Sequence, residues 1–143
     1  MDVQPIVTRL RQQLVDLPLR EIDGAAGLDA ARRGNRSAPA VYVLPLGEKA
    51  QATPLLGRTE HQETRLFGIV TVLDVHDFDR KSVLNLDTLR QRIKQALVGW
   101  PMDASTGEPV RFANGDLAQF EGDGRLWWID EFFVTAYFRN AAP

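Results

Sequence analysis

Apolar residues recur at helical spacing in two separate segments of the chain. The first segment runs from Pro5 to Leu17, and its apolar positions are Ile6, Leu10, Leu14 and Leu17. The second follows Asn85, a residue suited to an N-cap, and ends at Gly99 and Pro101. Its apolar stripe comprises Leu86, Leu89, Ile93, Ala96, Leu97 and Trp100. We therefore predict two main amphipathic helices, with a further short helix around Leu28 to Arg32.

Four other segments are rich in the β-branched and aromatic residues that favour strands. They are Ala38 to Leu46, Thr64 to His76, Val110 to Phe120 and Arg125 to Arg139. The last two are joined by Glu121-Gly122-Asp123-Gly124, whose glycines suit a tight hairpin turn. The order helix, strand, strand, helix, strand, strand predicts an α+β fold, with a mainly antiparallel four-stranded sheet and two main helices packed on one face.

A long polar segment separates the first two predicted strands. From Glu48 to Gln62 the apolar residues follow neither a strand period nor a helix period, and Pro54 and Gly57 interrupt the segment. We predict a projecting loop at about residues 47–63. Five of its residues form a small apolar tip with polar groups around it, a composition suited to docking against a partner. They are Leu55, Leu56, Lys49, Arg58 and Glu60.

The last predicted strand is apolar on both faces, because alternate residues of a strand point to opposite sides of a sheet. One face receives Leu126, Trp128, Phe132, Val134, Ala136 and Phe138. Two helices can cover that face but leave the other without a layer. We predict that a neighbouring subunit covers the second face. The predicted interface residues are Trp127, Ile129, Glu131, Phe133 and Tyr137. The alternative is that loops and residues 28–32 fold over this face.

The composition suits one globular domain. A chain of 143 residues is long enough to enclose one hydrophobic core, so we predict a single domain over residues 1–143. The formal net charge of −2 disfavours nucleic-acid binding as the main task. The absence of cysteine excludes disulfides and thiolate chemistry. We expect a cytoplasmic protein without a membrane partner, because no segment has the length of a membrane span or the pattern of a signal peptide.

An acidic cluster after the second predicted strand is the main candidate for enzymatic chemistry. It comprises Asp74, His76, Asp77 and Asp79, and it could serve a small metal-dependent hydrolase. Its spacing fails as a calcium loop, since Phe78 would occupy a ligand position, and we favour a solvated turn. His61 and His76 lie in neither a triad nor a zinc-helix pattern. We predict no catalytic residue, no metal site and no cofactor.

Two carboxylates, Asp130 and Glu131, interrupt the apolar last strand. Neighbouring strand residues face opposite ways, so this pair cannot act together on one bond. We interpret each as a rim residue paired with an arginine such as Arg125 or Arg139. Trp127 and Trp128 are interpreted as core and interface residues, because stacking on a base would require a basic groove.

Several of these segments together resemble the tail terminator, or tail completion, proteins of long-tailed bacteriophages. The shared features are a helical start, the strand Pro39-Ala-Val-Tyr-Val-Leu-Pro45, the strand Leu66-Phe-Gly-Ile-Val-Thr-Val, the helix Leu89 to Leu97 ending in Gly99-Trp100-Pro101, and the segment from Leu126-Trp-Trp-Ile-Asp-Glu-Phe to Tyr137-Phe-Arg139. The resemblance covers most of the chain.

The resemblance implies a six-fold homo-oligomeric ring that caps the tail tube and stops its polymerisation. Its implied partners are the tail tube protein and the head-tail connector protein, and genome DNA passes through the ring without specific binding. Assembly would take place in the host cytoplasm, and the ring would lie at the head-proximal end of the virion tail. A head-closure or neck protein of the same ring type is the alternative within this class.

Overall fold

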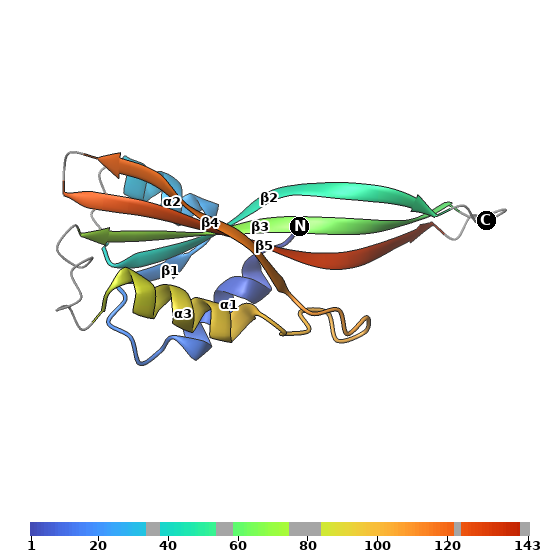
Figure 1. The fold of residues 1–143 in the computed structure, drawn as a ribbon, viewed down its shortest axis with the longest axis horizontal. Helices are drawn as coiled ribbons and strands as arrows, with labels where there is room; N and C mark the ends of the chain where they lie inside the picture. Colours follow the sequence, from blue (N-terminus) through green and yellow to red (C-terminus); the bar gives the residue numbers. More distant parts are fainter. Residues whose placement is uncertain (34–37, 54–58, 75–83, 122–123, 141–143) are drawn as a thin grey trace.

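A computed structural model describes residues 1–33, 38–53, 59–74, 84–121 and 124–140. These residues form one five-stranded sheet in the order β1-β2-β3-β5-β4, with three helices (Figure 1). The strands are β1 (Glu21–Asp23), β2 (Ala40–Thr53), β3 (Thr59–Asp74), β4 (Arg111–Glu121) and β5 (Arg125–Asn140). The helices are α1 (Gln4–Gln13), α2 (Ala25–Arg32) and α3 (Leu86–Leu97). The prediction of an α+β fold is confirmed.

The predicted count of four strands is wrong, because β1 forms a fifth strand at the sheet edge. It pairs in parallel with β2 through Glu21, Ile22 and Asp23, whereas all other strand pairs are antiparallel. A three-residue strand is too short to show a period of two in the sequence, so only its pairing with β2 defines it.

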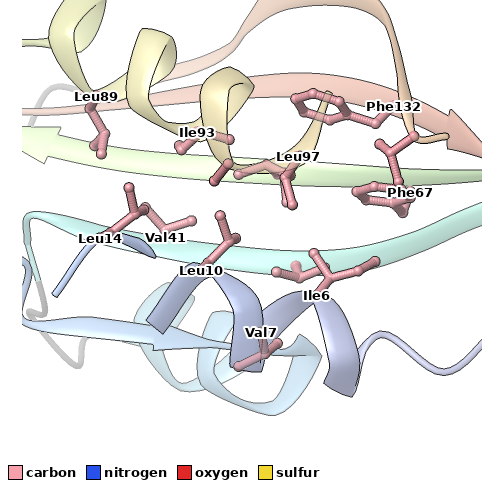
Figure 2. Close-up of a cluster of buried hydrophobic side chains, with 14 of the residues drawn as sticks. Ile6, Val7, Leu10, Leu14, Val41, Phe67, Leu89, Ile93, Leu97 and Phe132 are labelled. Carbon is pink, nitrogen blue, oxygen red and sulfur yellow. The ribbon is translucent and has the colours of Figure 1, made fainter. Parts of the chain in front are cut away.

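The two main helices, α1 and α3, pack on one face of the sheet (Figures 1 and 2). Asn85 caps α3 as expected, since its side-chain oxygen accepts a hydrogen bond of 2.9 Å from the Thr88 amide. On the sheet side, the rings of Phe67 and Phe132 stack with their centroids 5.6 Å apart. The side chains of the helix layer buried against them are Ile6, Val7 and Leu10 from α1, Leu14 at the α1 C-cap, and Leu89, Ile93 and Leu97 from α3. This helix layer, predicted from the apolar stripes, forms the main core.

The opposite face of the sheet is covered in part by α2 (Figure 1). Gly27 permits this, since a Cβ atom there would lie only 2.7 Å from the Asp23 carboxylate and 2.8 Å from the Asp23 Cβ. The second, smaller cluster contains Ala31, Ala38, Ala40, Tyr42, Val70, Val72 and Trp127. Residues 28–32, considered above as the alternative to a neighbouring subunit, therefore cover one end of this face.

The predicted loop at residues 47–63 is wrong over most of its length. β2 continues to Thr53 and β3 begins at Thr59, and the two strands pair from Thr53 and Glu60 down to the sheet body. β5 extends alongside β3 as far as Asn140. Residues 47–53, 59–66 and 133–140 thus form a three-stranded arm that projects beyond the helices (Figure 1). Because the arm has no helix layer, its strands show little apolar alternation in sequence.

Candidate assembly surface

The five predicted interface residues lie on one face of β5, the face opposite α1 and α3. Their exposure increases along the strand. Trp127 is buried beneath α2 at 6% exposure, Ile129, Glu131 and Phe133 are half-buried, and Tyr137 is 57% exposed. The α2 helix therefore covers the beginning of this row of side chains and leaves the rest without a layer.

Apolar side chains of β2 and β3 extend the uncovered region across the sheet. Leu66 is the cross-strand partner of Phe133, and Leu44 and Glu131 both lie opposite Gly68. A Cβ atom on Gly68 would lie 3.1 Å from both Ile129 Cδ1 and Leu46 Cδ1, so these two side chains meet over that glycine. We call the resulting patch the open apolar face. Its members are Leu44, Leu46, Leu66, Ile129 and Phe133, with Leu46 41% exposed.

A hydrogen bond anchors β1 at the covered end of the same face. The Tyr42 hydroxyl donates a hydrogen bond of 2.7 Å to the Glu21 carboxylate. Burial, together with that carboxylate, raises the pKa of the Tyr42 phenol. The phenol therefore stays protonated and keeps donating to β1 across the working pH range.

Asp130 does not lie on the rim, and its predicted pairing with Arg125 or Arg139 is wrong. It is 1% exposed and lies on the α3 side of the sheet, where Arg90 binds both carboxylate oxygens at 2.8 and 3.1 Å. The Trp128 indole N–H donates to the same carboxylate at 3.1 Å, and the Arg90 guanidinium lies 4.6 Å from the Trp128 ring centroid. Gly115 on β4 leaves room for the pair, because a Cβ there would overlap the Asp130 carboxylate.

The arm carries a charged row on its helix-side face. Glu63 accepts from Arg65 at 3.0 Å and contacts His61 at 2.6 Å, and Arg65 also lies 3.8 Å from Glu48. The His61 ring stacks on Phe138 with a centroid separation of 5.0 Å. The hydrogen bond from His61, reinforced by Arg65, holds the pKa of the Glu63 carboxyl below its usual range. These contacts join all three strands of the arm.

Two of the five predicted docking residues lie on the arm. Lys49 is exposed on β2, and Glu60 lies near the start of β3. Leu55, Leu56 and Arg58 lie outside the described residues. The structure therefore places Lys49 and Glu60 on the arm, which projects away from α3 and β1 (Figure 1).

The structure also bears on the chemistry considered for the acidic cluster. Asp74 ends β3, where its cross-strand partner is Arg125, whereas His76, Asp77 and Asp79 lie outside the described residues. Within residues 1–33, 38–53, 59–74, 84–121 and 124–140, no group of three or more His, Cys, Asp or Glu side chains is arranged to hold a metal ion. The helices in these ranges are also too short and too polar to cross a membrane.

Comparison with known families decides the class of the protein. The chain matches the family model described as phage tail terminator protein over residues 1–142. The chain belongs to the phage tail terminator family. It is therefore a structural component of a bacteriophage tail, as the resemblance of its segments implied. A search of curated protein sequences finds no significant match.

Proposed function

We propose that this tail terminator assembles into a closed ring, hexameric by the family resemblance, at the head-proximal end of the phage tail. The ring caps the tail tube, stops its polymerisation and joins the tail to the head connector. The role is mechanical and requires no catalytic residue, metal or cofactor.

The open apolar face is the observation that carries this proposal. Leu46 and Ile129 meet over Gly68, and Phe133 and Leu66 continue the patch toward the arm. Contiguous apolar surface rimmed by polar residues is typical of protein interfaces. A neighbouring copy that covers this patch would complete the layer that α2 begins over Trp127. Glu131 and Tyr137 would then lie at the polar border of the contact.

Ring closure explains how such a protein can terminate growth. A head-to-tail interface whose rotation closes forms a ring of fixed size with two dissimilar surfaces. One surface can bind the last layer of tube protein without offering that same surface to a further layer. The other surface is free for the connector, and genome DNA passes through the opening without specific binding. In this arrangement the predicted docking residues Lys49, Leu55, Leu56, Arg58 and Glu60 contact the tube.

Tail assembly with purified components tests the proposal. Wild-type protein should give tails of uniform length by electron microscopy, and Phe133→Asp should give monomers by mass measurement and tails of uncontrolled length. Leu117→Asp is the control for an added charge outside the open apolar face, since Leu117 is 51% exposed on β4 and lies on the other face of the sheet. Uniform tails with Phe133→Asp would exclude the open apolar face as the assembly contact.

A further inference from the structure

The arm has two open strand edges, one on each side. β1 pairs with β2 only as far as Tyr42, so the outer edge of β2 is free from Val43 to Thr53. β4 pairs with β5 only as far as Phe133, so the outer edge of β5 is free from Val134 to Asn140. Among the described residues, no backbone hydrogen bond joins either outer edge to another segment.

The two edges match each other in level and direction. Gly47, Leu66 and Phe133 lie side by side across the arm, so both edges are free over the same stretch. β2 and β5 are each antiparallel to β3, and they therefore both run toward the tip. A copy related by rotation about an axis along the arm would place its β2 edge beside β5 as a parallel pair.

Side-chain size also fits a second copy. At the β5 edge, Tyr137 and Phe138 are 57% and 46% exposed. On β2, Gln51 is level with Tyr137 across β3, and its polar side chain and the short side chain of the preceding Ala50 are both exposed. Large side chains on one edge would therefore lie beside small or polar ones on the other. The Tyr137 hydroxyl donates to Glu108 at 3.0 Å, but this side-chain contact leaves the β5 backbone edge unpaired.

From these features we infer that the outer edge of β5 in one copy pairs with the outer edge of β2 in the next copy. The inference rests on the proposed ring and adds a backbone contact between the arms to the contact through the open apolar face. Repeated around the ring, the three-stranded arms join into one cylindrical sheet without free edges. Free edges of this length otherwise promote uncontrolled association, and closure removes that hazard.

Disulfide trapping tests this pairing cleanly, because the chain contains no cysteine. Ala50 and Ala136 are both opposite Glu63 in β3, one on each side, and lie on the same face of the arm. Within one copy their Cα atoms are two strand spacings apart, about 10 Å, which is too far for a disulfide. Across the inferred contact they lie on adjacent strands. Oxidised Ala50→Cys/Ala136→Cys protein should therefore run as a ladder of covalent oligomers up to the full ring.

In a closed sheet each strand can be shifted along its neighbour. The second variant, Glu48→Cys/Ala136→Cys, therefore tests a register shifted by two residues on the same face. A ladder from either pair supports the inference. Each single cysteine variant should remain uncross-linked, and a covalent dimer from one of them would show a two-fold contact and overturn it. Ala50→Cys/Leu117→Cys tests the competing outer edge of β4, and a ladder from this variant alone would also overturn it.

The mass of wild-type protein under the same conditions separates this inference from the proposed function. If the wild-type protein forms a ring but neither Ala50→Cys/Ala136→Cys nor Glu48→Cys/Ala136→Cys gives a ladder, the edge pairing is excluded and the proposed function stands. A chain that stays monomeric would contradict the ring itself, and with it the edge pairing.

Discussion

The body and the arm of this protein share three strands but differ in what supports them. In the body, α1 and α3 bury one face of the sheet, and α2 buries part of the other. In the arm, the same three strands continue as a single layer whose helix-side face carries Glu63, Arg65 and His61. A small sheet without a helix or a second sheet against it is only marginally stable. The body can therefore fold by itself, whereas the arm is suited to gain stability from neighbouring copies.

The largest effect should come from the centre of the body. Phe132 is fully buried, stacks on Phe67 and meets Phe112 edge-on at 5.4 Å. Phe132→Ala should lower the free energy of unfolding by about 3 to 5 kcal/mol, because the cavity cannot close completely. Urea denaturation of the isolated subunit measures this change. Leu117→Ala, at a 51% exposed position of β4, is the control and is expected within about 0.5 kcal/mol of wild type.

The buried ion pair between α3 and β5 should give the next largest effect. Arg90→Met leaves Asp130 buried without its cation, and we expect a loss of about 3 kcal/mol in the free energy of unfolding. Arg90→Met combined with Asp130→Leu should recover most of that loss, because neither charge is then buried. A double variant less stable than the single one would contradict this account of the pair.

A smaller effect should follow from lifting α2 off the sheet. Gly27→Ala forces a methyl group against Asp23, and we expect a loss of about 1 to 2 kcal/mol in the free energy of unfolding. Exposure of Trp127 should shift the tryptophan emission to longer wavelength. Gly24→Ala is the matched control, since its nearest neighbouring atoms would lie 3.9 Å from the added Cβ. Equal spectra for the two variants would show that α2 does not shield Trp127.

The smallest effect should be a pH dependence confined to the arm. The pKa of the Glu63 carboxyl is lowered in the folded protein by His61 and then Arg65. This contribution to stability is present above the unfolded pKa of about 4.3, and it is lost as the pH falls through the lower folded value. The protection factors of the arm amides against hydrogen exchange should fall over that acidic range, and Glu63→Gln should remove this step. An unchanged profile in Glu63→Gln would assign the effect to other groups.

The local sequence pattern predicted those helices and strands whose apolar residues recur at a regular spacing. The stripes beginning at Ile6 and Leu86 predicted α1 and α3, although each helix ends before the last residue of its stripe, and Asn85 predicted the start of α3. The alternation in β5 also separated the helix-side residue Phe132 from Phe133 on the other face. These features depend on neighbours within one or two turns or along one strand, so the sequence contains the information directly.

Only the tertiary structure decided the contacts between segments far apart in the chain. Residues 48–53 and 59–62 have no apolar period, and they form strands because β3 pairs with both β2 and β5. The ion pair of Asp130 with Arg90 joins positions 40 residues apart, and no local spacing indicates it. Trp127 is buried because α2 folds back over β2 and β3, whereas Phe133 on the same face has no such cover. Burial and pairing of this kind are properties of the whole sheet, and a periodicity read along one strand cannot specify them.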